Sequence, residues 1–173
     1  MNFLILCIHV ETTMPKKTLY IARHAKSSWG DMSLSDFERP LNGRGKRDAP
    51  FMANLLKEKG ITPDLILSSP AKRTKKTAKH YHEALGGELR FDENIYEAST
   101  ITLYTLLKEV FKTVDSIMIV GHNPGFTALN DMLSDKEIFN IPTAGAVGIV
   151  FEDAVSMGGG KQLFFEYPKK YQK

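Results

Sequence analysis

Three short apolar segments of this chain each lead into arginine or histidine side chains, residue types that can bind and transfer phosphate. The segments and the side chains that follow them are 18–22 with Arg23 and His24, 64–69 with Arg73, and 116–120 with His122. Arginine holds phosphate oxygens with a planar fork of donors and stays charged at any working pH. A neutral imidazole nitrogen can attack phosphorus. If the fold brings these residues together, phosphoryl transfer is the chemistry that they suit.

Strands and helices are expected to alternate along the chain. Strand-like runs cover 18–23, 64–69 and 116–120, and segments with helical spacing cover 42–60, 71–85, 100–112 and 126–133. Two short segments, around 88–91 and near 95–96, lie between the second and third of these helices. Two further β-rich segments, 146–151 and 162–167, are joined by a glycine-rich loop, which is typical of a hairpin. The pattern predicts an α/β fold: a three-layer α/β/α sandwich with a mostly parallel central sheet and one antiparallel edge strand.

A mostly parallel sheet collects the residues that follow its strands. The carboxyl ends of parallel strands lie at one edge, which is where ligands of open α/β folds bind. The arginine and histidine side chains named above are therefore expected to converge at that edge. Arg73 also lies close to an expected helix start, where free N–H groups and the helix dipole favour an anion.

The motifs around these residues extend over most of the chain, about 18–130. They are Arg23, His24 and Ala25; Arg39, Pro40, Leu41 and Asn42 with Gly45; Ser68, Ser69 and Pro70 with Arg73 and Thr77; and Val120, Gly121, His122, Asn123 and Pro124. In this order and spacing they resemble the histidine phosphatase superfamily, also called the phosphoglycerate mutase-like fold. Within that superfamily the sequence is similar to the SixA-type phosphohistidine phosphatases.

The resemblance implies a role for five of these side chains. His24 corresponds to the nucleophile, which carries the phosphoryl group as a covalent intermediate. Arg23, Arg39 and Arg73 correspond to the phosphate clamp. His122 corresponds to the second histidine, which contacts the phosphoryl group and stabilises charge in the transition state. Three arginines and two histidines would supply the positive field that many phosphotransferases obtain from magnesium, so no metal and no other cofactor is expected.

One acidic residue, Glu97, stands where many members of the superfamily carry the proton donor for the leaving group. The alternative interpretation of this position is a plain surface glutamate. An alkyl phosphate needs such a donor more than phosphohistidine does, because an imidazole leaving group depends less on a strong acid. Glu97 is therefore a hint of ester substrates.

The length of chain between the motifs bears on the substrate. The interval from His24 to Arg73 and the interval from Arg73 to His122 are both 49 residues long. The strands and helices of the fold occupy both intervals completely. They leave no room for the long insertions that cover the pocket in relatives acting on small sugar phosphates. An open site could admit a phosphorylated protein, and the alternative partner is a small phosphorylated metabolite. The residues that follow His24, at positions 25–29, differ from those at the same place in shorter SixA-type proteins. The sequence predicts a phosphatase that hydrolyses a phosphomonoester or phosphohistidine through phospho-His24.

Three other functions stay open at this point. A small-molecule phosphatase or mutase of the same superfamily would use the same chemistry. A phosphorelay protein would store phosphate on His24, and a noncatalytic module would bind a phosphoprotein in the same pocket. Because both histidines and the acidic candidate are present, catalysis is favoured over binding alone.

Composition excludes several classes of function. With 173 residues, 42% hydrophobic and 25% charged, the chain fits one globular domain. The net charge of +3 is too small to argue for nucleic acid without a binding motif, and it is compatible with anionic substrates. The lone Cys7 allows no intramolecular disulfide and points to a reducing compartment. We therefore expect a cytoplasmic protein, and we expect it to be a monomer.

The first residues of the chain need separate treatment. The apolar stretch 2–10 is too short to span a bilayer, which takes about 20 residues, and it lacks the basic flank and cleavage site of a signal peptide. No association with a membrane is therefore expected. Met14, which two lysines and the first strand follow closely, fits a true start. We expect 1–13 to be a leader that is foreign to the native protein or disordered, and 14–173 to form a single domain.

Overall fold

The computed structural model describes residues 16–172. The expected leader, 1–13, and the expected start at Met14 lie outside the described residues. Within 16–172, six strands form one sheet in the order β3-β2-β4-β1-β5-β6. Their bounds are β1 (Lys17–Arg23), β2 (Leu65–Ser68), β3 (Glu88–Phe91), β4 (Ser116–Gly121), β5 (Ala146–Phe151) and β6 (Lys161–Glu166).

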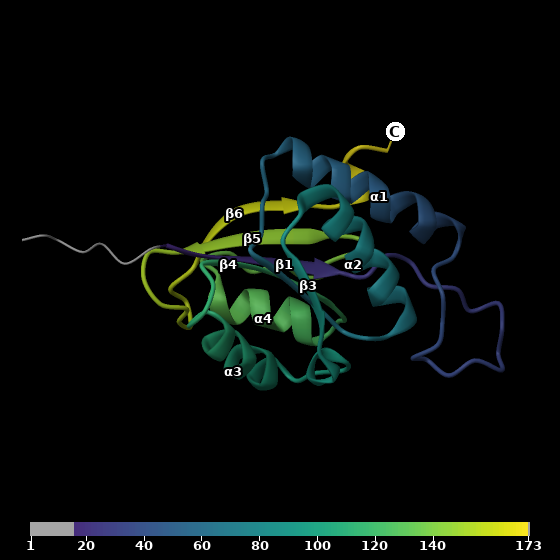
Figure 1. The fold of residues 1–173 in the computed structure, drawn as a ribbon, viewed down its shortest axis with the longest axis horizontal. Helices are drawn as coiled ribbons and strands as arrows, with labels where there is room; N and C mark the ends of the chain where they lie inside the picture. Colours follow the sequence, from purple (N-terminus) through teal and green to yellow (C-terminus); the bar gives the residue numbers. More distant parts are fainter. Residues whose placement is uncertain (1–15, 173) are drawn as a thin grey trace, which may run out of the picture.

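Helices cover both faces of this sheet (Figure 1). They are α1 (Gly43–Glu58) and α2 (Lys72–Leu85) on one face, α3 (Thr100–Val110) and α4 (Gly125–Leu133) on the other, and the short 3-10 helices η1 (Glu93–Ile95) and η2 (Pro168–Lys170). The predicted three-layer α/β/α sandwich is therefore confirmed. No helix in the described part of the chain has the length and apolar character needed to cross a membrane.

The strand directions agree with the prediction except in one detail. β1, β2, β3 and β4 run parallel to one another. β5 runs antiparallel to β1, but it is not the edge strand, because β6 pairs with its other side and forms the edge. Two β-rich segments in succession indicate that they pair with each other. They carry no signal for which of the two joins the rest of the sheet.

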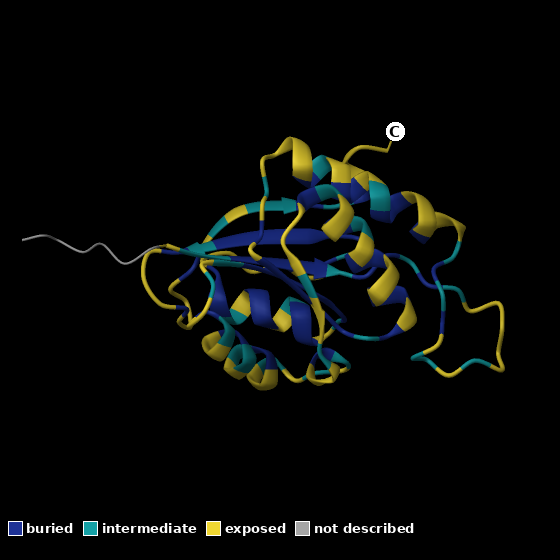
Figure 2. Cartoon of the chain, viewed as in Figure 1, coloured by how far each residue is buried: buried dark blue, intermediate teal, exposed yellow. Residues whose placement is uncertain are grey.

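The sheet is apolar on both faces because helices cover both. In β1, Leu19 and Ile21 are fully buried against the side of α3 and α4, while Tyr20 and Ala22 pack on the side of α1 and α2. Figure 2 shows the central strands as buried between the helices. Double coverage explains why the parallel strands read as continuous apolar runs. Each fully buried leucine or isoleucine contributes about 1.5–3 kcal/mol relative to an exposed one.

The start of α1 packs directly on the segment that follows His24. Asn42 caps the helix, because its Oδ1 accepts a hydrogen bond of 2.9 Å from the backbone N–H of Gly45. A Cβ atom on Gly45 would lie 2.1 Å from the carbonyl oxygen of Lys26. Glycine therefore allows α1 to approach this segment, and the contact fixes the course of the chain just beyond His24.

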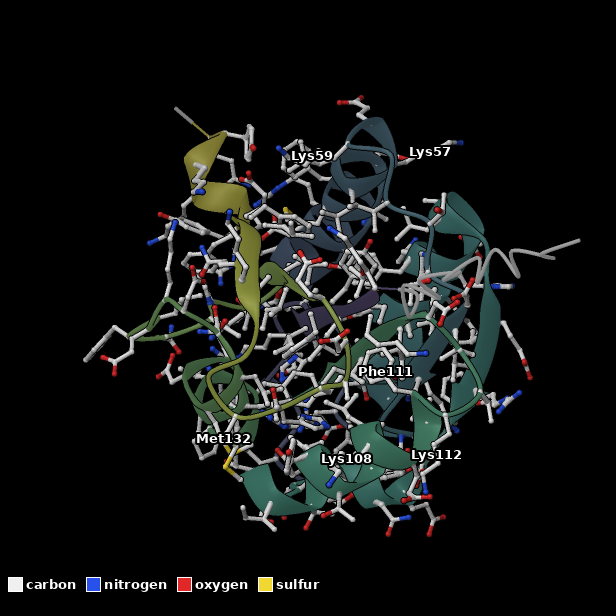
Figure 3. The ribbon with its side chains drawn as sticks, turned by 90° about the vertical axis from the view of Figure 1, so that its left-hand side faces the viewer. Lys57, Lys59, Lys108, Phe111, Lys112 and Met132 are labelled. Carbon is white, nitrogen blue, oxygen red and sulfur yellow. The ribbon has the colours of Figure 1, made fainter. Side chains whose placement is uncertain are left out.

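The amino ends of the parallel strands form the edge of the sheet that is remote from His24. This edge faces the viewer in Figure 3. A cavity of about 590 Å³ lies there, and Lys108, Phe111 and Lys112 at the end of α3 contribute to its lining. Within the described residues, its other lining residues are Lys17, Asp153, Ala154 and Val155, so the lining contains neither histidine nor arginine. Size alone therefore does not identify the functional site of this protein.

Candidate active site

The carboxyl ends of β1, β2 and β4 lie next to one another. Arg23, the last residue of β1, pairs with Gly121, the last residue of β4, and β2 pairs with β4 along its whole length. These ends are on the right-hand side of Figure 1, where the β1 arrow points. His24 and His122 follow the paired ends, and their ring centroids are 5.2 Å apart.

One cavity at this edge collects the side chains that the sequence singled out. Its volume is about 320 Å³. It is lined by all six candidate residues, which are Arg23, His24, Arg39, Arg73, Glu97 and His122. The other lining residues are Lys26, Ser27, Trp29, Asp36, Asn123 and Thr143. The structure thus brings the six candidates together at the carboxyl edge of the sheet.

His24 is buried and neutral at neutral pH. Its Nδ1 lies 2.8 Å from the carbonyl oxygen of Ala25, and this contact assigns the ring proton to Nδ1, which donates it. Its Nε2 accepts a hydrogen bond of 3.3 Å from Nε of Arg73. Burial first of all, and then the charges of Arg73 and Arg23, lower the pKa of His24 to about 4, against the opposing effect of the hydrogen bond to Ala25. Nε2 therefore keeps the lone pair that a nucleophile requires.

His122 is a second neutral histidine. Its Nδ1 accepts from Nη2 of Arg73 at 3.2 Å, so its proton is assigned to Nε2, which lies 2.9 Å from Oγ of Ser69. Burial, and then the charges of His24 and Arg73, lower the pKa of His122 to about 3. In the free protein the two histidines are therefore uncharged, and the positive charge of the site comes from the arginines.

Arg73 connects the two histidines. It lies in the first turn of α2, and its side chain is 5% exposed. Its Nε contacts His24, its Nη2 contacts His122, and its Nη1 donates to the main-chain carbonyl of Asp36. Because the nitrogens of one rigid guanidinium touch both imidazoles, Arg73 fixes their relative positions.

Arg39 and Arg23 have N–H groups that could donate hydrogen bonds to an anion. Nε and Nη1 of Arg39 and Nε of Arg23 are buried without a hydrogen-bond partner among residues 16–172. The ring of Trp29 stacks on the Arg39 guanidinium at 3.5 Å, and Nη1 of Arg23 donates to the carbonyl of Ile141 at 2.8 Å. A buried donor without an acceptor costs about 1–3 kcal/mol. Such donors around one cavity are what a site for an anion requires.

Glu97 lies exposed in the lining of the same cavity. Its backbone φ is +50°, in the left-handed region that non-glycine residues adopt at a cost of about 1–2 kcal/mol. The lining contains two carboxyl groups, those of Asp36 and Glu97. Asp36 is paired with arginines, whereas Glu97 forms no ion pair within residues 16–172. Of the two carboxyl groups in the lining, Glu97 is therefore the one that no arginine of the described residues holds.

Sequence reasoning missed the parts that Asp36 and Tyr96 take in the site. The Asp36 carboxylate forms ion pairs of 2.7 Å with Arg39 and with Arg73, and it accepts a hydrogen bond of 2.9 Å from the Tyr96 hydroxyl. Burial alone raises the pKa of Asp36, but hydrogen bonds from Arg73 and Tyr96 and the charges of both arginines lower it overall.

In residues 16–172, no three His, Cys, Asp or Glu side chains are grouped as ligands for a metal.

Fold and site together define an α/β protein with a cavity lined by arginine and histidine at the carboxyl ends of its parallel strands, an arrangement suited to phosphoryl chemistry. Residues 19–113 match the family described as the histidine phosphatase superfamily, branch 1. The chain therefore belongs to the histidine phosphatase superfamily, and its enzyme class is that of a phosphatase.

Three known proteins show the extent of the likeness. An uncharacterised chloroplastic protein of Arabidopsis thaliana is 32% identical over 163 residues, which cover 86% of this chain and 75% of that protein. A candidate phosphohistidine phosphatase SixA from Agrobacterium tumefaciens, known from its crystal structure, is 30% identical, with a TM-score of 0.77 over 90% of this chain and 99% of that chain. A protein histidine phosphatase SixA, solved with tungstate, shares the fold at 18% identity, with a TM-score of 0.77 over 90% and 99% of the two chains.

Proposed function

We propose that the protein is a SixA-type phosphatase that hydrolyses a phosphomonoester or phosphohistidine by way of a phosphoryl group carried on His24. The observation that carries this proposal is the environment of His24. Its Nε2 presents a neutral lone pair beside Arg73, while its Nδ1 donates to the carbonyl of Ala25. When Nε2 forms a bond to phosphorus the ring gains positive charge, and the carbonyl of Ala25 stabilises that charge.

In the first step, the hydrogen bond from Nε of Arg73 to Nε2 of His24 gives way, the freed lone pair on Nε2 attacks phosphorus, and the bond between phosphorus and the leaving group breaks. The electron pair of that bond departs with the leaving oxygen or nitrogen, which takes a proton from the carboxyl group of Glu97. Arg23, Arg39 and Arg73 hold the phosphoryl oxygens and offset the charge that develops on them. His122 lines the same cavity, and its Nδ1 accepts a hydrogen bond from Nη2 of Arg73 and so helps to position that guanidinium against the phosphoryl group.

In the second step, water attacks the phosphorus of phospho-His24. Glu97, which is now ionised, accepts a proton from this water. The N–P bond breaks and its electron pair returns to Nε2, so inorganic phosphate is released. Both residues end the cycle in the states in which they began it, and one water is consumed for each phosphoryl group removed.

A phosphorylated protein side chain, phosphohistidine first, is the proposed substrate. Two observations support it: the 30% identity to the candidate SixA protein over nearly the whole of both chains, and an exposed rim on which Trp29 is 64% exposed. The second candidate function is a small-molecule phosphatase. Glu97 favours it, because an ester leaving group needs a proton donor more than imidazole does.

Hydrolysis of p-nitrophenyl phosphate in the presence of EDTA tests whether the protein is this enzyme. The wild type is expected to turn over, and His24→Ala is expected to lose activity and the phosphoryl group that rapid quenching and mass spectrometry detect on His24. Phospho-His24 that persists in water would instead indicate a phosphorelay protein. Phosphate binding without hydrolysis of any phosphorylated compound would indicate a binding module.

Rates on different substrates separate the two candidate functions. The value of kcat/KM for a phosphohistidine-bearing protein should exceed the values for a panel of phosphorylated metabolites. The reverse order would replace the protein phosphatase with the small-molecule phosphatase.

We also propose that residues 14–173 form the functional unit, a single domain that works as a cytoplasmic monomer. Residues 14–173 contain no cysteine, which is compatible with a reducing compartment. A variant that starts at Met14 should match the full chain in activity and in Tm. Analytical ultracentrifugation tests whether the protein is a monomer. Cell fractionation tests whether it is cytoplasmic.

A further inference from the structure

A carboxylate lies between two arginines of the proposed phosphate pocket. Oδ1 of Asp36 pairs with Nη2 of Arg39, and Oδ2 of Asp36 pairs with Nη2 of Arg73, both at 2.7 Å. The Tyr96 hydroxyl donates to the same Oδ2 at 2.9 Å, and the same Nη2 of Arg73 contacts His122. These are the partners that an oxygen of a bound phosphoryl group would take, since both anions suit the fork of a guanidinium.

The carboxylate can leave this position while the arginines stay. The side chain of Asp36 is 40% exposed, whereas those of Arg39 and Arg73 are 9% and 5% exposed. Asp36 lies on the connection between β1 and α1, which projects on the right-hand side of Figure 1 and is largely exposed in Figure 2. Its main-chain carbonyl is held by Nη1 of Arg73. The backbone can therefore remain in place while the side chain turns toward water.

We propose that Asp36 is an internal anion of the phosphate clamp: it pairs with Arg39 and Arg73 in the free protein and gives way to the phosphoryl group when substrate binds. This inference rests on the proposed function of the same cavity. Its consequence is competition. Part of the attraction that the arginines offer to phosphate is used to displace Asp36, so substrate and product are both held less tightly than by the arginines alone.

The physical reason for competition is that both anions would lie at contact distance on the same guanidinium groups: Asp36 takes Nη2 of Arg39 and of Arg73, and the Nε and Nη1 of Arg39, which have no partner within residues 16–172, belong to the same guanidinium. Hydrogen bonds and charges from its partners lower the pKa of Asp36, so the carboxylate is ionised wherever phosphate is a dianion. Like charges at contact distance repel, and a partly buried pocket weakens that repulsion less than bulk water does. Since inorganic phosphate must leave after every turnover, a displaceable carboxylate shortens the time for which the product occupies the clamp.

Calorimetric titration with inorganic phosphate measures this competition without any need for turnover. Asp36→Asn keeps the size of the side chain and removes its charge, and it is expected to bind phosphate at least about tenfold more tightly than the wild type. Glu38→Gln is the matched control, because Glu38 is an exposed carboxylate on the same connection. The control should bind phosphate within about twofold of the wild type, since solvent screens its charge.

A second variant keeps the test independent of how well Asp36→Asn folds. Tyr96→Phe leaves the carboxylate in place but removes a hydrogen bond that holds it in the cavity. Phosphate affinity should therefore rise by about two- to fivefold, which is the worth of one hydrogen bond.

Weaker phosphate binding by Asp36→Asn, restored in Asp36→Glu, would overturn the proposal, because it would mean that the carboxylate only holds the arginines in position. Unchanged affinity in both Asp36→Asn and Tyr96→Phe would overturn it as well. A wild type that binds phosphate but hydrolyses no phosphorylated compound would remove the proposed function, while the comparison of affinities would still decide the role of Asp36.

Discussion

Acidification should destabilise the protein through His24, because the folded state favours the neutral form of this buried side chain. The pKa of His24 is lowered from 6.5 to about 4, chiefly by burial, so the unfolded chain binds a proton at this position that the folded chain does not. The stabilisation from this residue is fully present above about pH 6.5 and is lost as the pH falls toward about 4. Between about pH 7.5 and pH 5, His24 alone is expected to account for a loss of about 2 kcal/mol in the free energy of unfolding.

Urea unfolding of the wild type and of His24→Gln at these two pH values measures the effect. Glutamine has a similar length and does not titrate, so the variant should lose about 2 kcal/mol less than the wild type on acidification. Most other titrating groups, including His122, contribute to both proteins and largely cancel in the comparison. Equal losses would refute the reasoning, because they would show that the folded protein accommodates a charged His24 as well as the unfolded chain does.

Three further predictions concern the clamp, the proton donor and the packing of α1. Arg73→Lys should lower kcat/KM at least about 100-fold, because the single ammonium of lysine cannot contact both histidines and the phosphate as the planar guanidinium fork does; steady-state kinetics near the wild-type rate would contradict this. Glu97→Gln should lower kcat for an alkyl phosphate about 100-fold and for phosphohistidine less than about tenfold, and equal effects on the two rates would remove Glu97 as the acid. Gly45→Ala should cost about 2 kcal/mol or more in urea unfolding, because the new Cβ would lie 2.1 Å from the Lys26 carbonyl oxygen. Gly43→Ala is its control: nothing lies within 4 Å of a Cβ at Gly43, so a similar loss there would contradict the packing argument.

The elements that carry the motifs were accessible to sequence reasoning. The predicted strand 64–69 and helix 71–85 correspond to β2 (Leu65–Ser68) and α2 (Lys72–Leu85). A strand covered on both faces must be apolar throughout, and a helix on a sheet must be apolar along one stripe, so both leave a local signal. The convergence of the candidate residues follows in turn, because parallel strands end at a common edge.

The position of Asp36 left no such signal. It belongs to the irregular connection between β1 and α1, where neither the period of a strand nor that of a helix tells which way a side chain points. Its spacing of three residues from Arg39 is compatible with an ion pair, but its second partner, Arg73, is 37 residues away along the chain. The place of β6 outside β5 was hidden for a similar reason, since pairing between consecutive strands does not say which one faces the rest of the sheet.

Residue types and their order thus determined by themselves the fold class, the edge of the sheet that holds the site, and the phosphoryl chemistry for which histidine and arginine are suited. Tertiary structure alone decided the state of those groups: that His24 and His122 are neutral, that Arg73 holds both of them, and that Asp36 rather than Glu97 pairs with the clamp. The physical reason is that burial and charge act through distance in space. Residues far apart in the chain set the pKa of each group, and the sequence does not record their separations.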